Sequence, residues 1–247
     1  MRFDNYVASV LNISRNKASE LIKSGKVLAD GEICTKVSSE VSEAKISLLD
    51  EIYVGRGALK LKSFLEAMKF DLAGKNALDI GSSTGGFMQI LLERGVKSVT
   101  GVDVGTDQLD VSLRGDERVK IYEKTDVREF AKSYQNKFDL ITCDVSFISL
   151  AEILPVIGEL ASENSLIITL FKPQFEVGVG VKRSKKGVVT DAKAVNLAMK
   201  RFEVLASSLK FELIACKECE IKGKEGNAEF FYAFNKRQYH CRCDRAL

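Results

Sequence analysis

The stretch ALDIGSSTGGF (residues 77–87) begins as an apolar strand, passes through a glycine-rich turn and opens a helix. Its glycines are Gly81, Gly85 and Gly86, a G-x-x-x-G-G spacing that differs from the G-x-G-x-x-G of dinucleotide-binding turns. Glycine has no Cβ, so the backbone can come close to a ligand. The turn therefore predicts a nucleoside site without a pyrophosphate, and a methionine-bearing nucleoside fits it.

The chain on either side of this turn alternates between short β-rich runs and helical stretches. After the strand at 76–80 we predict strands at 98–102, 120–123, 140–143 and 166–171. Strands that alternate with helices favour a doubly wound, mostly parallel sheet. Residues 211–221 and 229–234 have no helix between them, so we predict an antiparallel hairpin that closes the sheet.

Two acidic residues follow the glycine turn at strand ends. Asp103 closes the second strand about 20 residues after the turn, where a carboxylate can bind both ribose hydroxyls of a nucleoside. Asp126 closes the third strand, and we expect it to accept a hydrogen bond from an adenine amino group. Either acid alone could simply cap a helix.

These three features together resemble the class I methyltransferases that use S-adenosyl-L-methionine. The resemblance implies that cofactor as the ligand. The candidate cofactor-binding residues are Asp79, Gly81, Ser82, Ser83, Thr84, Gly85, Gly86, Phe87, Asp103, Val104, Asp126 and Val127.

The first 48 residues have a different pattern, which predicts a small α+β module. Ser14 is placed to cap a helix over 15–24 that Gly25 ends, and Asp30-Gly31 is a hairpin turn signal between two short strands. The basic residues of these elements form either a phosphate-binding face or a solvated surface.

The segment RFDNYVASVLNISRNKASELIKSGKVLADGEICTK (residues 2–36) resembles an S4 domain, an RNA-binding module. The resemblance implies that Arg15, Lys17 and Lys26 contact RNA, and Arg2 joins them as a candidate. We expect an S4-like domain at 1–48, a linker at 49–57, a methyltransferase domain at 58–237 and a tail at 238–247.

Four charged residues are candidates for the chemistry. Lys60 lies on the flank of the apolar stripe of a helix predicted over 57–69, where a lysine could simply extend along the surface. Asp144 and Lys172 follow strands at the carboxyl edge, where doubly wound sheets keep their sites, and Glu229 begins the last strand.

Methyl transfer to a ribose hydroxyl requires an in-line approach and removal of a proton from a weak acid. A lysine can remove that proton only where desolvation or a neighbouring cation lowers its pKa. We expect Lys172 to be the base with Lys60 nearby, and Asp144 and Glu229 to hold the two ammonium groups.

The order Lys60, Asp144, Lys172, Glu229 is similar to the K-D-K-E tetrad of RNA ribose 2′-O-methyltransferases. The motifs RGALKL, DVSFISL, LFKPQFEVG, GVV and NAEFF, with the S4-like module, resemble the haemolysin-A-type (TlyA) ribosomal RNA 2′-O-methyltransferases. This resemblance implies methylation of a cytidine ribose in ribosomal RNA. The family has a shorter and a longer form, and the shorter form is associated with large-subunit RNA alone. The chain resembles the shorter form, which implies 23S rRNA as the substrate. The partner is then ribosomal RNA or a ribosomal subunit, and the oligomeric state stays open.

Two further segments have alternative interpretations. The run KRSKK at 182–186 predicts a mobile basic loop that clamps RNA through Lys182 and Arg183, or else a solvated loop; Arg56 is another candidate RNA contact. Cys216 and Cys219 with the cysteines and His240 of the tail could suggest zinc, but they lack the tight turn of a zinc knuckle, so we expect no metal.

Composition limits the function classes. Of the 247 residues, 45% are hydrophobic and 29% are charged, which is ordinary for a globular protein, and the net charge of +3 leaves phosphate binding to local patches. No apolar run approaches the roughly 18 residues of a spanning helix, and no signal peptide is apparent, so we expect a cytoplasmic protein without a membrane partner. Two rival classes are an RNA-binding protein with a non-catalytic methyltransferase fold and a membrane-active haemolysin.

Overall fold

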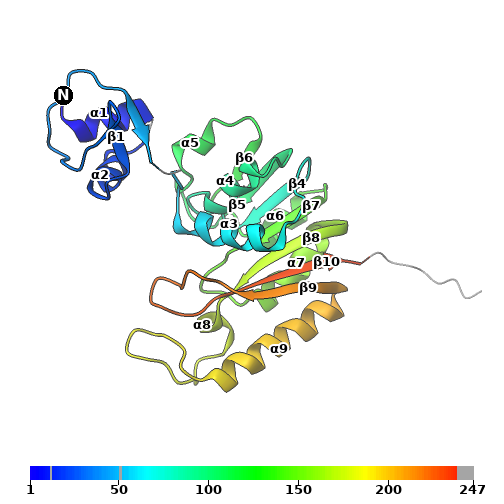
Figure 1. Ribbon diagram of the computed structural model, residues 1–247. Coiled ribbons are helices and arrows are strands. Elements are labelled where there is room, and N and C mark those ends of the chain that lie inside the picture. The colour runs from blue at the N-terminus through cyan, green and yellow to red at the C-terminus, as the bar shows by residue number, and fades with distance from the viewer. Residues whose placement is uncertain (12, 50–51, 238–247) are drawn as a thin grey trace, which may run out of the picture. The chain divides into compact units, whose positions relative to one another are not determined.

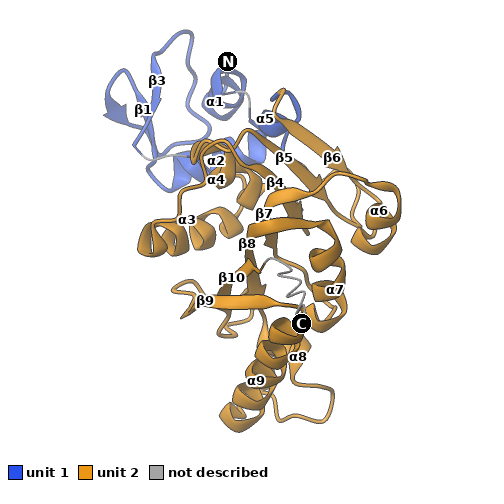
Figure 2. Cartoon of the chain, turned by 90° about the vertical axis from the view of Figure 1, so that its right-hand side faces the viewer, with its two compact units in different colours: residues 1–53, 110–116 blue, residues 54–109, 117–247 orange. Residues whose placement is uncertain are grey.

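The computed structural model describes residues 1–11, 13–49 and 52–237. These residues form two compact units, which Figure 2 shows in different colours. Unit 1 comprises residues 1–53 together with 110–116, and unit 2 comprises residues 54–109 together with 117–247. The predicted tail at 238–247 lies outside the described residues.

Unit 1 pairs two helices with a small sheet. The helices are α1 (Phe3–Leu11) and α2 (Arg15–Lys23), and the strands β1 (Val27–Ala29), β2 (Glu32–Ile33) and β3 (Ile46–Leu48) lie in the order β2-β1-β3. Ser14 caps α2 by accepting a hydrogen bond from the Lys17 amide, and Asp30 and Gly31 make the hairpin turn with positive φ angles of 52° and 87°. Both local predictions are confirmed, whereas β3 was not predicted.

The same division of the chain assigns the short helix α5 (Val111–Arg114) to unit 1. Asp110 caps this helix by accepting a hydrogen bond from the Ser112 amide. The core of unit 1 contains Phe3, Val7, Ala18, Leu21, Ile22 and Val27.

Unit 2 is built on one seven-stranded sheet with the order β6-β5-β4-β7-β8-β10-β9. Its strands are β4 (Asn76–Ile80), β5 (Ser98–Val102), β6 (Val119–Tyr122), β7 (Phe138–Cys143), β8 (Ala161–Phe171), β9 (Phe211–Glu218) and β10 (Phe230–Lys236). The strands β4 to β8 pair in parallel, while β10 pairs antiparallel with both β8 and β9. The predicted parallel sheet and its terminal antiparallel hairpin are confirmed.

Helices cover both faces of this sheet (Figure 1). They are α3 (Arg56–Met68), α4 (Gly86–Glu93), α6 (Val127–Ser133), α7 (Leu150–Leu160), α8 (Pro173–Glu176) and α9 (Ala192–Ser208). The two faces are visible in β10, because neighbouring strand residues point in opposite directions. Phe231 stacks on Phe64 of α3 at 4.6 Å, whereas Tyr232 packs edge-on against Phe202 of α9 at 5.0 Å.

The strand order reverses at β4. The chain continues from β4 to β5 and β6 on one side, and then returns to β7 and β8 on the other. Doubly wound sheets bind ligands in the crevice at such a switch point, outside the carboxyl ends of the strands. Among the described residues, no helix has the length and apolar character needed to cross a membrane.

Candidate active site

The glycine turn lies at the carboxyl end of β4, against the end of β7. Gly81 has a φ of 79°, and a Cβ built on it would lie 2.7 Å from the backbone oxygen of Asp144. Gly81 is therefore required for the close approach of two strand ends, not only for an approach to a ligand. Gly85 caps α4 with a φ of 91° and donates its amide to the Ser82 carbonyl.

Asp103 holds the turn in place from the end of β5. One carboxylate oxygen accepts a hydrogen bond from the Ser83 amide at 2.8 Å, and the other accepts one from the Gly105 amide at 2.6 Å. Ser83 has a positive φ of 46°, which a non-glycine residue adopts only where neighbours hold it. The predicted ribose-binding acid is thus also a structural brace for the glycine turn.

A cavity of about 390 Å³ opens beside this turn. Its lining includes six predicted cofactor residues, namely Gly81, Ser83, Asp103, Val104, Asp126 and Val127. It also includes residues that were not predicted, among them Gln108, Thr125 and the segment Val145–Ile148. The segment follows β7 directly after Asp144, so its position at a strand end was the available signal.

Asp126 lines this cavity, as predicted for a cofactor-binding acid, and it also forms the helix cap that the sequence left open as an alternative. Strand β6 ends at Tyr122, and Asp126 caps helix α6 by accepting a hydrogen bond from the Arg128 amide. The Arg128 guanidinium also donates to both of its carboxylate oxygens, at 2.9 and 2.6 Å. These contacts, led by the side-chain hydrogen bond, lower the pKa of Asp126.

A second hollow of about 240 Å³ connects the turn to the helix α3. It is lined by the predicted residues Arg56, Lys60, Asp79, Gly81, Ser82, Ser83, Thr84, Gly86, Phe87 and Asp144, together with Gly55 and Gly57. The two hollows share Gly81, Ser83 and Asp144. All of the predicted cofactor residues except Gly85, and two of the predicted catalytic residues, therefore line adjoining hollows.

Asp79 is a buried acid at the base of this second hollow. Its Oδ1 accepts a hydrogen bond from the Thr142 hydroxyl at 2.7 Å, and its Oδ2 has no partner among the described residues. Burial raises the pKa of Asp79 to about 7, and the charges of Asp144 and Asp103 act in the same direction, against the hydrogen bond from Thr142. The buried Ser82 hydroxyl likewise has no partner within the described part of the chain. Two unpaired polar groups therefore face a space that a polar ligand could fill.

The four predicted catalytic residues form two ion pairs. Lys60 Nζ lies 2.6 Å from Glu229 Oε2, and the side chains are only 8% and 3% exposed. The alternative in which Lys60 extends along the surface is wrong, because the buried carboxylate of Glu229 holds its ammonium group inside. Lys172 Nζ lies 2.6 Å from Asp144 Oδ1 and donates to the Ser146 hydroxyl at 2.9 Å.

The register of the sheet brings the two pairs to one edge. Strands β8 and β10 pair with Phe171 opposite Phe230. Lys172 follows Phe171 and Glu229 precedes Phe230, so the same antiparallel register sets these two residues opposite each other. Asp144 follows β7, the other neighbour of β8. Each lysine has a carboxylate partner, as the sequence predicted for Asp144 and Glu229.

In unit 1, the predicted RNA contacts are partly engaged with an acid. Arg2 and Arg15 both pair with Asp4, at 3.1 and 2.8 Å, and Asp4 itself is buried. The hydrogen bond from Arg2, followed by the contacts of Arg15, lowers the pKa of Asp4 to about 2. About half of each arginine side chain remains exposed, and Lys17 pairs with Glu20 at 3.7 Å. Lys26 directly precedes β1, and its amide donates to the Leu21 carbonyl.

The basic segment at 182–186 belongs to a hydrogen-bonded hairpin and is not an irregular loop, whereas its mobility stays a prediction. The Arg183 guanidinium donates to the carbonyl oxygens of Gln174 and Gly178. Arg183 is thus an anchor of the segment, and Lys182 is exposed. Of the residues considered for zinc, His240, Cys241 and Cys243 lie outside the described residues, and the described part of the chain contains no cluster of three metal-ligating side chains.

Comparison with known families divides the chain as the fold does. A model of the FtsJ-like methyltransferase family matches residues 53–236, and an S4 domain model matches residues 1–45. The chain is 48% identical to the 23S rRNA (cytidine-2′-O)-methyltransferase TlyA of Campylobacter jejuni, over 96% of this chain and 100% of the relative. It is 39% identical to the 16S/23S rRNA (cytidine-2′-O)-methyltransferase TlyA of Mycobacterium tuberculosis, over 88% of this chain and 83% of the relative.

A solved structure has the same architecture. It is described as "Putative hemolysin from Streptococcus thermophilus" and superimposes with a TM-score of 0.70 at 31% identity. The likeness covers 96% of this chain and 89% of the other. The two-part organisation is therefore shared over nearly the whole length.

Proposed function

We propose, because the chain belongs to the FtsJ-like methyltransferase family and to its TlyA branch, that it methylates the 2′-oxygen of a cytidine ribose in ribosomal RNA. The relative from C. jejuni, which matches this chain along its full length, is named for 23S rRNA, and 23S rRNA is the substrate that we propose here. The observation that carries the proposal is the pairing of Lys60 with Glu229 and of Lys172 with Asp144 at the carboxyl edge of the sheet.

The cavity supports S-adenosyl-L-methionine as the methyl donor. The Asp103 carboxylate stands at one end of the lining, where it can bind ribose hydroxyls, and Val127 provides an apolar wall. Within the described part of the chain, Asp79 Oδ2 and the Ser82 hydroxyl are buried without partners, and both residues line the second hollow together with Lys60. An apolar lining with a few convergent polar groups suits a nucleoside that carries a charged amino acid portion. When bound, S-adenosyl-L-methionine would supply an electrophilic methyl group.

The chain's own residues divide the remaining work. Lys172 accepts the proton of the ribose 2′-hydroxyl, and its partner Asp144 holds the ammonium group that results. The Ser146 hydroxyl fixes the direction of the Lys172 amine. Lys60 is held by Glu229 near the glycine turn, where its charge stabilises the oxyanion as the proton leaves.

Unit 1 supplies RNA binding in this proposal. Its S4 match and the exposed portions of Arg2 and Arg15 support contact with phosphates, together with Lys17 and Lys26. We propose that the chain consists of a docking domain at 1–48, a linker at 49–57 and a methyltransferase domain at 58–237. Helix α3 already begins at Arg56, so the end of the proposed linker is helical. From a ribosomal substrate we infer that the protein acts in the cytoplasm.

The rival classes explain the structure less well. A methyltransferase fold that does not catalyse a reaction would not need two buried or half-buried lysine–carboxylate pairs. The desolvation of such pairs costs free energy that their mutual attraction often does not recover, so their presence favours a catalytic role. The haemolysin name is attached to a related structure, but a membrane-active role would not account for the ion pairs or the cavity.

The proposal is tested by incubating the purified protein with ribosomal subunits and labelled S-adenosyl-L-methionine, followed by mapping of the modified nucleotide. We expect label in the large-subunit RNA, at the 2′-oxygen of a cytidine. Label on a base, or in protein alone, would contradict the proposal.

A further inference from the structure

The segment that follows α8 folds into a small hairpin with lysines at its tip. Arg183 and Val189 form an antiparallel bridge, and the Ser184 amide donates to the Val188 carbonyl at 2.8 Å. The Ser184 hydroxyl also accepts from the amides of Lys186 and Val188. The turn is therefore held by hydrogen bonds within the hairpin itself.

The hairpin is attached to the catalytic edge on two sides. The Arg183 guanidinium donates to the carbonyls of Gln174 and Gly178, which lie within and just after α8. On the other side, the Val189 amide donates at 2.9 Å to the side-chain oxygen of Asn227, which is 5% exposed. Asn227 stands two residues before Glu229, and α8 begins directly after Lys172. Both anchors are thus neighbours of the proposed catalytic residues.

A second loop lies against this hairpin. The connection between β9 and β10 turns at 223–227, where the Gly223 amide donates to the Asn227 carbonyl and the Gly226 amide donates to the Gly223 carbonyl. A Cβ built on Gly226 would lie 3.9 Å from a methyl group of Val188. The two loops therefore pack together beside the catalytic edge, and Figure 1 shows them as the connections next to α8 and between β9 and β10.

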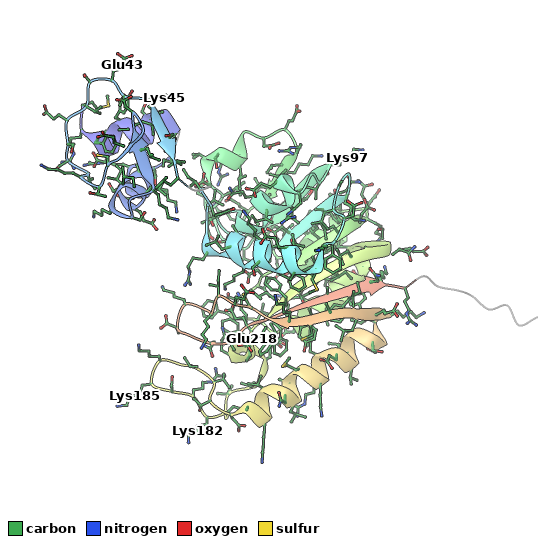
Figure 3. The ribbon with its side chains drawn as sticks, viewed as in Figure 1. Glu43, Lys45, Lys97, Lys182, Lys185 and Glu218 are labelled. Atoms are coloured by element: carbon green, nitrogen blue, oxygen red, sulfur yellow. The ribbon has the colours of Figure 1, made fainter. Side chains whose placement is uncertain are left out.

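The paired loops concentrate positive charge. Residues 182–189 and 222–227 contain six basic side chains and a single acid, Glu225. Five exposed lysines form what we call the two-loop surface: Lys182, Lys185, Lys186, Lys222 and Lys224. Among the described residues, the ammonium groups of these five have no hydrogen-bond or ion-pair partner. Figure 3 shows Lys182 and Lys185 directed outward from the hairpin.

Such an arrangement suits a polyanion that lies along the edge of the active site. Exposed lysines without acidic partners bind phosphates as point charges, whereas ordinary solvated surfaces intersperse both signs. The whole chain has a net charge of only +3, so this concentration is local. The pre-formed hairpin also reduces the entropy that would be lost on ordering a flexible loop.

We propose that the two-loop surface binds the phosphodiester backbone of the substrate RNA next to the target ribose, as a phosphate site within the catalytic unit itself. This inference rests on the proposed function and goes beyond it, because it assigns RNA contacts to Lys185, Lys186, Lys222 and Lys224. It also changes the role of Arg183 from an RNA contact to the anchor that positions these lysines.

The test compares the full-length Lys185→Ala/Lys186→Ala protein with a matched control. The control, Lys97→Ala/Lys120→Ala, removes two exposed lysines. Lys97, which is labelled in Figure 3, directly precedes β5, and Lys120 lies in β6. A charge-conserving variant, Lys185→Arg/Lys186→Arg, keeps the phosphate attraction. The probes are protein-free 23S rRNA and the intact large subunit, measured at several salt concentrations, with cofactor affinity measured separately by calorimetry.

We expect the alanine variant to bind protein-free RNA about 2- to 30-fold more weakly, because it loses two exposed ion pairs between lysines and RNA phosphates. The slope of log affinity against log salt should become shallower by about 0.7–0.9 for each phosphate that the variant no longer neutralises. Cofactor affinity, the control and the arginine variant should match the wild type.

An unchanged RNA affinity and salt slope for the alanine variant would overturn the inference. So would a weakening seen with the intact subunit but not with protein-free RNA, because it would assign the surface to a ribosomal protein. Methylation by the wild type is measured first, so absence of any rRNA methylation would count against the proposed function and is distinguishable from a failure of this surface.

Discussion

Replacement of Lys172 tests the proposed base most directly. Its amine lies 2.6 Å from Asp144 and 2.9 Å from the Ser146 hydroxyl, and the residue is 8% exposed. Lys172→Met keeps much of the volume but removes the amine, and Lys172→Arg keeps a positive charge that cannot be given up at any usable pH. If Lys172 accepts the proton, both variants lose methyl transfer.

The expected loss of catalytic rate and the expected loss of folding stability differ in size. Loss of a general base lowers the rate by about 10²–10⁴-fold, which corresponds to about 3–5 kcal/mol in the barrier. Lys172→Met also leaves Asp144 without its cation. The Asp144 side chain is 21% exposed, so we expect folding stability to fall by only about 1–3 kcal/mol. A well-folded protein with a much slower chemical step is therefore the expected result.

The assay is single-turnover methylation of 23S rRNA, with RNA affinity and cofactor affinity measured in parallel for each variant. Lys97→Met, a change to an exposed lysine before β5, serves as the control and should retain wild-type rates. If Lys172 only gripped a phosphate, the arginine variant would be active and the methionine variant would bind RNA weakly. An active arginine variant would refute the assignment of Lys172 as the base.

Three further changes have defined outcomes. Asp103→Ala should weaken S-adenosyl-L-methionine binding by about 1.5–3 kcal/mol, because the ribose hydroxyls lose a charged acceptor; unchanged affinity by calorimetry would remove Asp103 from the site. Glu229→Ala leaves the Lys60 ammonium buried and unpaired, so denaturant unfolding should show a loss of about 3–5 kcal/mol, whereas the double variant Lys60→Met/Glu229→Leu should lose less. The pKa of Asp79 is raised to about 7 in the folded protein, so its ionisation opposes folding as pH rises from about 4 to 7. Asp79→Asn should therefore gain stability over wild type progressively across that range in thermal unfolding, and a constant difference would contradict the raised pKa.

Much of the fold was predictable because its signals are local. The glycine turn at 81–86, the cap at Ser14 and the turn at Asp30-Gly31 are each set by a few neighbouring residues, and the structure places them as predicted. The alternation of strands and helices indicated the parallel sheet, and the missing helix before β10 indicated the hairpin. The strand β3 was missed because three residues are too few to show a period, and no hairpin turn signal marks it as Asp30-Gly31 marks β1 and β2.

The candidate site depended more heavily on tertiary structure. Lys60 looked like a surface lysine from its helix alone, because its partner Glu229 is 169 residues away in the chain. Periodicity reports which face of an element is apolar, but it does not show which distant charge will meet a given side chain. In the same way, only the folded chain showed that Arg183 anchors a hairpin and that Asp126 forms the helix cap that the sequence had left as an alternative.

The sequence by itself thus determined the order of the elements, the position of the nucleoside turn and the candidate residues at the strand ends, since these follow from local backbone preferences and strand direction. The tertiary structure decided which of those residues pair, which are buried and which loops lie together beside the site. Those outcomes depend on the sheet register that sets Phe171 opposite Phe230, and on the desolvation that follows when α3 packs over that sheet edge.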